Sequence, residues 1–335
     1  MNLIVTLIGI KCIGLLIINY ILPYILILSS KDQDFKKKYG KWALVTGSSS
    51  GIGKSIAHRL ASQGISIILV AKDDQFFDEM LNEIKLKYKS INFLPIKLDL
   101  TKPESIKDLI NKLKEFESNK ILKINDIRIL FNNAGYFVME GFNQTSYDND
   151  KLKMIQCNTL TSVELTDYFY RIWVENKNKN KNKNENNIDK RKNGLIIFTS
   201  SVAAVFPSPY SVIYSSCKSF LSSFASSLAL EAKLNDVDIL AVQPGRVETR
   251  IFDNVPNLLT LRIMKLFSQK PDQVVDIMFR SAGRYGIVNF NSGFFAILSC
   301  LIFNIFGPNL TNKIVYLLSK YIFTDYYSHC GKINK

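Results

Sequence analysis

Short apolar runs alternate with amphipathic stretches along most of the chain, from Lys41 onward. Amphipathic patterns fill the gaps; residues 53–64, for example, end at a glycine suited to a helix C-terminus. Such alternation is typical of a parallel sheet with crossover helices. It predicts an α/β fold, a doubly wound parallel sheet. The expected strands are residues 42–47, 66–71, 92–99, 127–132, 194–200 and 237–243.

The N-terminal residues break this alternation. Residues 3–28 are apolar apart from Lys11 and a few other polar positions, and about 20 such residues span a bilayer. A cleaved signal peptide is the alternative; the length, the uncharged start and the lack of a clear cleavage site favour a retained membrane anchor at 1–30. The basic residues of 31–41 favour leaving the following domain in the cytosol. Pro23 fits either a kinked span or a hairpin-like insertion.

The C-terminal residues 291–335 form a second apolar region, which follows an expected catalytic domain at 41–290. Its two apolar stretches, 294–307 and 313–327, suit membrane docking at the interface better than a span. A helix packed on the domain, or a contact in a homodimer, is the alternative. Before this region, residues 255–270 have the apolar content of a lid over a lipophilic pocket, and Pro271 begins a further helix.

The net charge of +14 first suggests a nucleic-acid partner. Residues 176–193 alone carry seven Lys/Arg and two Asp/Glu, a net +5, which leaves +9 for the other residues. This Asn/Lys-rich tract is too polar to bury anything and is expected to be a disordered surface loop. We expect no nucleic-acid partner, although a basic binder of RNA or of membrane surfaces is kept as an alternative. The five cysteines form no CxxC and indicate no metal site.

Polar motifs follow the expected strands. Ligands of open α/β sheets bind outside the carboxyl ends of the strands, so these motifs should gather at one edge. Five scattered signals then become one site. They are TGSSSGIG (46–53), DLT (99–101), NNAG (132–135), SS (200–201) and PGRVET (244–249).

A serine, a tyrosine and a lysine stand out near the middle of the chain. Ser201 precedes Tyr214 by thirteen residues, and Lys218 follows Tyr214 by four. On a helix, a spacing of four places Tyr214 and Lys218 on the same face. An ammonium about 4 Å from a phenolate contributes about 4 kcal/mol, enough to bring the pKa of a phenol toward neutrality. We therefore expect Tyr214 to act as a general acid or base, with Ser201 holding a substrate oxygen.

The glycine-rich turn after the first strand indicates a dinucleotide cofactor. Glycine permits the tight turn and a close approach of the backbone to a pyrophosphate at the helix N-terminus. At the end of the second strand, Ala71 replaces the acidic residue that usually binds a free ribose 2′-OH, and Lys72 follows it. This favours NADP(H). Asp73 and Asp74 are the reservation, because they could turn toward the ribose.

Together these motifs resemble the short-chain dehydrogenase/reductase family over residues 40–255, and the resemblance implies a Rossmann-type domain. It implies that Tyr214 transfers the proton, that Lys218 lowers its pKa and binds the nicotinamide ribose, and that Ser201 orients the substrate. Asn158 would keep a relay water near the lysine. The chain departs from the usual motif at Cys217 and at Ser50, where many NADP-using members have a basic residue. The expected cofactor-binding residues are Gly47, Ser49, Ser50, Gly51, Ile52, Gly53, Lys72, Asp99, Asn132, Asn133, Tyr214, Lys218 and Thr249.

The resemblance extends to members anchored in the endoplasmic reticulum that act on steroids, retinoids, 3-keto acyl chains or sphingoid ketones. It implies hydride transfer between NADP(H) and the carbonyl or secondary alcohol of a lipophilic substrate, with reduction as the expected direction. A catalytically silent scaffold of the same fold, at a membrane or a lipid droplet, is the alternative. An intact set of Asn158, Ser201, Tyr214 and Lys218 argues against it.

Overall fold

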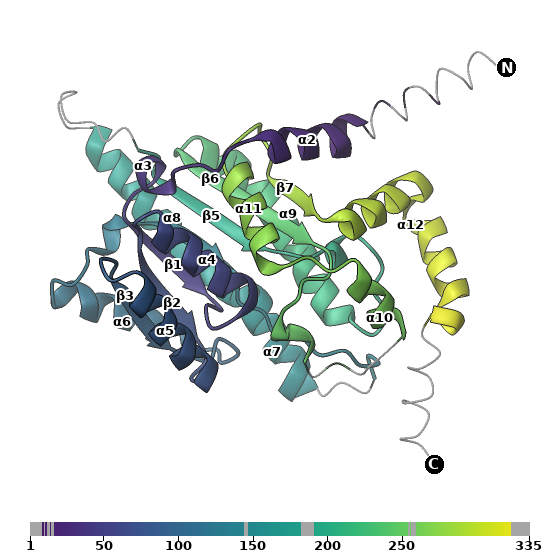
Figure 1. The fold of residues 1–335 in the computed structure, drawn as a ribbon, viewed down its shortest axis with the longest axis horizontal. Helices are drawn as coiled ribbons and strands as arrows, with labels where there is room; N and C mark the ends of the chain where they lie inside the picture. The colour runs from purple at the N-terminus through teal and green to yellow at the C-terminus, as the bar shows by residue number, and fades with distance from the viewer. Residues whose placement is uncertain are drawn as a thin grey trace.

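A single seven-stranded parallel sheet organises the computed structural model, which describes residues 9, 11, 14, 17–143, 147–181, 191–253, 255 and 259–322 (Figure 1). The strand order is β3-β2-β1-β4-β5-β6-β7, and every neighbouring pair is parallel. From β1 to β3 the strands are added on one side of β1, and from β4 to β7 they are added on the other side. This change of side makes the sheet doubly wound, as the sequence predicts. The strands are β1 (Trp42–Thr46), β2 (Ser66–Ala71), β3 (Phe93–Lys97), β4 (Ile127–Asn132), β5 (Gly194–Thr199), β6 (Val237–Pro244) and β7 (Asn289–Ser292).

Helices cover both faces of this sheet and divide its core in two. On one face α4, α5 and α11 pack against β-strand side chains such as Val45, and on the other α6, α8 and α9 pack against side chains such as Leu44. Burial on both faces explains why the central strands are continuous apolar runs. The helices are α2 (Leu22–Ser29), α3 (Phe35–Lys38), α4 (Gly51–Ser62), α5 (Gln75–Lys87), α6 (Ser105–Ser118), α7 (Leu152–Ile155), α8 (Thr161–Lys181), α9 (Val212–Lys233), α10 (Leu259–Leu266), α11 (Pro271–Ser281) and α12 (Phe294–Ile322).

The domain is larger than the expected 41–290. Phe35 and Tyr39 are fully buried, and the Phe35 ring stacks on Phe279 of α11 at 4.2 Å between centroids. At the other end, β7 runs to Ser292 and is the outermost strand. The sequence NFNS of this strand is too short and too polar to be recognised as a strand.

The residues between the N-terminal apolar segment and the sheet are docked on the domain. Asp32 pairs with Arg59 of α4 and with Arg280 of α11, the latter at 3.1 Å. Gln33 donates its Nε2 to the carbonyl of Ala282 at 2.8 Å. The phenol of Tyr39 donates to Asp238 at 2.8 Å. These bonds fix a segment that composition alone presents as a basic linker.

The Asn/Lys-rich tract begins as a helix, so the expectation of a disordered loop from residue 176 is wrong for its first residues. Helix α8 continues to Lys181, and Lys177 forms an ion pair of 2.6 Å with Asp236. Residues 182–190 lie outside the described part of the chain.

Both apolar ends lie beside the sheet edge at β7. The expected anchor is described only in part: α2 presents exposed Ile25 and Leu28, and its Tyr24 ring stacks on Phe290 of β7 at 6.0 Å. Within the described residues, Phe294–Ser319 of α12 is long and apolar enough to cross a membrane. A break at Gly307 (φ 71°, ψ 169°), before Pro308, divides this helix.

The first half of α12 packs on the domain, as one of the two alternatives predicts for the tail. Ala296 and Cys300 are buried with Val202, which follows the candidate serine. Of the expected lid, α10 is described, whereas residues 254 and 256–258 are not.

Candidate active site

The glycine-rich turn after β1 has the shape that a dinucleotide requires. Gly47 and Gly51 have positive φ values of 65° and 53°, which favour glycine. A Cβ on Gly53 would lie 2.0 Å from the carbonyl oxygen of Gly47. Ser50 occupies the N-cap position of α4, and Ile52 is buried in the core beneath the turn. The turn therefore leaves the first backbone N–H groups of α4 open to a phosphate.

Asn133 braces this turn from the end of β4. Its Nδ2 donates to the carbonyl oxygens of Thr46 at 3.0 Å and Gly47 at 3.3 Å, and its Oδ1 accepts from Thr199 of β5 at 3.0 Å. Asn132 points to the opposite side of the sheet, where it donates to Thr166 of α8 at 3.1 Å. Of the two asparagines expected at the cofactor site, Asn133 therefore contacts the glycine-rich turn, whereas Asn132 contacts α8.

Ser201 and Tyr214 meet where β5 ends and α9 begins. The Ser201 side chain accepts a bond from Ala203 N at 3.2 Å and is hydrogen-bonded to the Tyr214 hydroxyl. Burial raises the pKa of Tyr214 to about 12, while the bond with Ser201 acts in the opposite direction. The phenol is therefore protonated at neutral pH.

The expected lowering of the Tyr214 pKa by Lys218 is not observed. Lys218 Nζ lies 5.5 Å from the centroid of the Tyr214 ring and donates to the carbonyl of Thr199 at 2.8 Å. Burial is the largest cause of the raised pKa of Tyr214, and burial also lowers the pKa of Lys218 itself to about 8. The lysine is nevertheless charged at pH 7. It supplies a buried cation beside the proton donor.

Asn158 lies in a π-helical turn, Gln156–Leu160, between α7 and α8. Its amide is held twice by Tyr136, which donates its backbone N–H at 3.0 Å and accepts from Asn158 Nδ2 at 2.7 Å. A Cβ on Gly135 would lie 3.2 Å from Asn158 Oδ1 and 3.8 Å from Lys218 Nζ. Asn158, Lys218 and the NNAG motif therefore converge on one point, as the sequence predicts.

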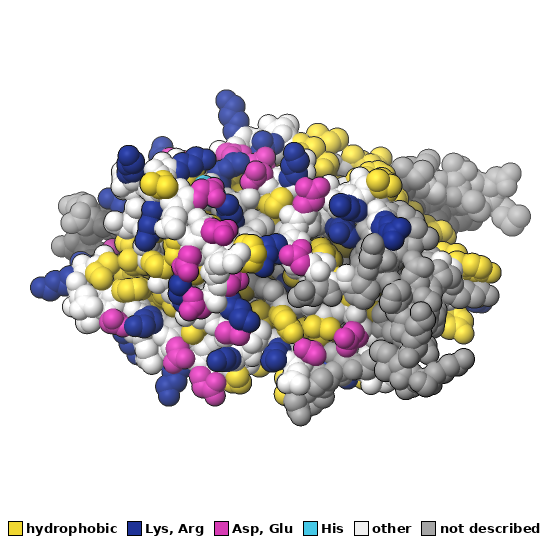
Figure 2. Space-filling model, turned by 60° about the horizontal axis from the view of Figure 1, so that its bottom comes forward, with side chains coloured by type: hydrophobic (Ala, Val, Ile, Leu, Met, Phe, Trp, Pro, Cys, Tyr) yellow, Lys and Arg dark blue, Asp and Glu magenta, His cyan; other side chains and the backbone are white. Residues whose placement is uncertain are grey.

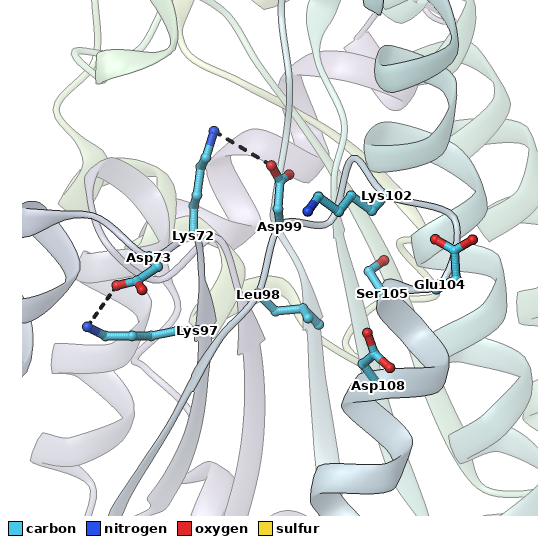
Figure 3. Close-up of a pocket in the computed structure, with 9 residues that line it drawn as sticks. All are labelled: Lys72, Asp73, Lys97, Leu98, Asp99, Lys102, Glu104, Ser105 and Asp108. Atoms are coloured by element: carbon cyan, nitrogen blue, oxygen red, sulfur yellow. Dashed lines mark ion pairs between the residues drawn. The ribbon is translucent and has the colours of Figure 1, made fainter.

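The second strand ends beside a cavity of about 390 Å³ (Figure 3). Lys72 Nζ lies 3.6 Å from Asp99, whose other oxygen accepts from Thr101 at 2.7 Å. Asp73 is paired with Lys97 at 2.8 Å, away from Lys72.

Asp74, the second acidic residue of the reservation, is also engaged elsewhere. Its carboxylate caps α5 by accepting from Phe77 N at 3.0 Å. Lys72, by contrast, has a side chain that is 70% exposed beside the cavity. Asp73 lines the same cavity and is 71% exposed, with its carboxylate paired to Lys97, whereas Asp74 is not among the lining residues.

Thr249 and an aromatic wall complete the edge. The Thr249 methyl packs so closely on Gly51 that a Cβ there would lie 2.7 Å from it. Phe137 contacts the Tyr214 ring edge-on at 4.7 Å, and Phe252 contacts Phe137 at 5.7 Å. Arg246 stands over the Phe252 ring at 4.8 Å. Sequence reasoning missed Phe137 and Phe252, because single aromatic residues in loops carry no motif. Arg246 belongs to the PGRVET motif but was not singled out there.

Fold and site together define an oxidoreductase of the Rossmann type, with a dinucleotide cradle next to a serine–tyrosine–lysine set. The turn fits such a cofactor, because a Cβ at Gly47, Gly51 or Gly53 would lie too close to neighbouring protein atoms and would force this tight turn to open. The family model of the short chain dehydrogenases matches residues 41–258, and the chain belongs to this family.

Similar proteins include very-long-chain 3-oxoacyl-CoA reductases. That of Neurospora crassa is 32% identical over 220 residues, which cover 64% of this chain and 59% of the relative. That of Macaca fascicularis is 31% identical, with 63% and 61% covered. The match thus spans about six-tenths of the length of these relatives.

Solved structures show the same fold. One, described for the stereoselectivity of 7beta-hydroxysteroid dehydrogenase, has a TM-score of 0.68 at 18% identity and covers 86% of this chain and 100% of its own. A short-chain dehydrogenase from Sphingobium yanoikuyae in complex with NADPH has a TM-score of 0.60 at 24% identity, with 75% and 87% covered.

Proposed function

We propose that this protein is a membrane-anchored, NADP(H)-dependent reductase that converts the ketone of a lipophilic substrate, of the 3-oxoacyl type, to a secondary alcohol. The observation that carries the proposal is the convergence of Asn158, Ser201, Tyr214 and Lys218 beside the glycine-rich turn.

Each residue of the set has a separate task in the reaction. NADPH, held at the glycine-rich turn and by Lys218, would supply the hydride for the carbonyl carbon. Tyr214, protonated because its pKa is about 12, gives its proton to the carbonyl oxygen, which Ser201 holds by its hydroxyl. The ammonium of Lys218 stabilises the phenolate that this transfer leaves. Asn158, clamped by Tyr136, positions the water that returns a proton.

A raised pKa suits reduction better than oxidation. A donor must be protonated before the reaction, and a phenol with a pKa of about 12 is protonated across the physiological range. Oxidation would need the phenolate, which burial disfavours here. A protonated Tyr214 thus supports the proposal that the protein works as a reductase.

Lys72 supports NADP(H) over NAD(H). It lies at the end of β2 with an exposed ammonium, whereas Asp73 and Asp74 are held by Lys97 and by the start of α5. A basic residue at this position usually meets a 2′-phosphate. A structural neighbour described in complex with NADPH is consistent with this assignment.

The substrate class rests on the relatives and on the apolar surroundings. Two of the similar proteins are named very-long-chain 3-oxoacyl-CoA reductases. Leu266 at the end of α10, within the expected lid, and Phe294 at the start of α12 are 81% and 64% exposed. Exposed apolar side chains of this kind suit a long acyl chain.

The test is oxidation of NADPH by the detergent-solubilised protein with a panel of 3-oxoacyl-CoA esters, steroid ketones and retinal. We expect the highest kcat/KM with long-chain 3-oxoacyl-CoA and a clear preference for NADPH over NADH. Lys72→Ala should lower the NADPH/NADH ratio of kcat/KM about tenfold, the loss of one charged hydrogen bond. Lys179→Ala, near the end of α8, is the control, because that lysine is 72% exposed like Lys72 and does not line the cavity. An NADH preference of the wild type would contradict the cofactor assignment. Turnover of steroid ketones with no turnover of 3-oxoacyl-CoA esters would contradict the substrate class.

The membrane association rests on the two apolar ends of the chain. Exposed apolar side chains of α2 and α12 lie at the same edge of the sheet, and on the face shown in Figure 2 acidic and basic side chains are interspersed elsewhere. The basic residues of 31–41 support the proposal that the catalytic domain faces the cytosol. The resemblance to family members anchored in the endoplasmic reticulum supports the proposed location there.

Cell fractionation tests this association. We expect the protein to stay in microsomes washed with alkaline carbonate and to be digested by protease added to intact microsomes. Release by carbonate would contradict the anchor. Protection from protease would contradict the cytosolic orientation.

A further inference from the structure

Residues 249–253, directly after the PGRVET motif, cover the edge where the motifs gather. Thr249 packs on Gly51 of the glycine-rich turn, and Ile251 lies where a Cβ on Gly135 would be 3.5 Å from its Cδ1. Arg250 places its guanidinium carbon 3.2 Å from the centroid of the Phe76 ring, in the first turn of α5. The segment therefore touches two of the motifs, those after β1 and β4, and the helix that follows β2.

The contact between Arg250 and Phe76 joins opposite sides of this edge. Arg250 follows β6, and Phe76 follows β2. Strands β1, β4 and β5 lie between these two, and adjacent strands are about 4.8 Å apart. The chain thus reaches back about 19 Å across the carboxyl ends of the strands. On the way it passes the N-terminus of α4, where backbone N–H groups favour an anion.

Neither side chain of the pair serves the core. Phe76 is half-buried, whereas the adjacent Phe77 is fully buried in the core beneath α5. Arg250 has a side chain that is 42% exposed, and its Nε lies 3.4 Å from Asp253, three residues later on the same segment. The ion pair with Asp253 holds the guanidinium over the face of the ring, where a cation–π contact forms.

We propose that Arg250 and Phe76 form a latch that closes residues 249–253 over the bound dinucleotide and adds the arginine charge to the phosphate site of α4. The latch rests on the proposed function, because it needs a dinucleotide in the cleft. Its role is to slow the release of the cofactor. It is distinct from Lys72, which lies at the cavity beside Asp99 and selects the cofactor.

The experiment measures the dissociation rate of NADPH by stopped flow, with excess NADP⁺ as the competitor and NADPH fluorescence as the signal. Phe76→Leu keeps an apolar side chain but removes the ring, and Arg250→Lys keeps the charge but removes the planar group. Each variant should release NADPH about threefold to thirtyfold faster, the range of a cation–π contact. The double variant should release it no faster than the faster single variant, because both changes break one contact.

Lys265→Ala, on the exposed side of α10, is the matched control and should release NADPH at the wild-type rate. A wild-type rate in Phe76→Leu, or rates that multiply in the double variant, would overturn the latch and leave the cofactor assignment intact. Failure of the wild-type protein to bind any nicotinamide dinucleotide would overturn the proposed function instead. Thermal melting of each variant without cofactor shows whether folding is retained.

Discussion

Replacing Tyr214 by phenylalanine is expected to lower kcat for ketone reduction by about 100-fold to 10,000-fold, the usual contribution of a positioned general acid. The change removes only the hydroxyl that gives the proton and leaves the ring against Phe137. The dissociation constant for NADPH and the melting temperature should stay close to those of the wild type. Steady-state kinetics with a long-chain 3-oxoacyl-CoA, together with NADPH titration, measure both quantities.

Tyr88→Phe is the matched control, because Tyr88 ends α5 beside His58, on the helix layer that α4 and α5 form. It should keep wild-type kcat. Unchanged turnover in Tyr214→Phe would remove this residue from the reaction. If cellular function also persisted in that variant, the result would support the alternative of a silent scaffold.

Replacing Gly53 by alanine is expected to damage both the fold and the cofactor site. The added Cβ would lie 2.0 Å from the carbonyl oxygen of Gly47 and 2.7 Å from Asn133 Nδ2, and the first of these is backbone that cannot rotate away. Overpacking of this kind costs about 1–3 kcal/mol or more, which corresponds to a fall in melting temperature of about 3–12 °C. Affinity for NADPH should fall as well, since the turn must open.

Gly245→Ala provides the comparison for stability. A Cβ at Gly245 meets its nearest atoms, in Phe295 and Ala296, at an ordinary 3.5 Å, and its φ is not positive. Its melting temperature should therefore lie within about 2 °C of the wild type, less than the change that about 1 kcal/mol produces. Equal melting temperatures for the two variants would show that the close approach of Gly53 to Gly47 is not a constraint.

The sheet was predictable from the sequence because each central strand is buried on both faces and is therefore a continuous run of apolar residues. Strands such as β2 and β4 match their expected residues from end to end. The motifs that follow them are local, so their order along the chain was sufficient to place them at one edge. Asn158 and Lys218 converge there as expected, although 60 residues and a helix separate them.

The rest depended on contacts that no local pattern encodes. The pKa of Tyr214 is set by its burial, and spacing along α9 reveals only that Lys218 is near. Phe35 and Tyr39 look like part of a basic linker until the ring of Phe279 and the carboxylate of Asp238 are seen beside them. Strand β7 owes its place to pairing with β6, since its own residues have little strand preference.

The docking of residues 32–39 has a mechanical consequence. A loose tether would let the catalytic domain tumble above a bilayer, whereas the bonds of Asp32, Gln33 and Tyr39 make the join stiff. The domain would then stand at one height and one tilt over the lipid. In the proposed membrane-bound form, the active-site entrance would then keep one orientation toward the bilayer. Substrate delivery would depend on diffusion of the substrate within the membrane plane, and no longer on the orientation of the domain.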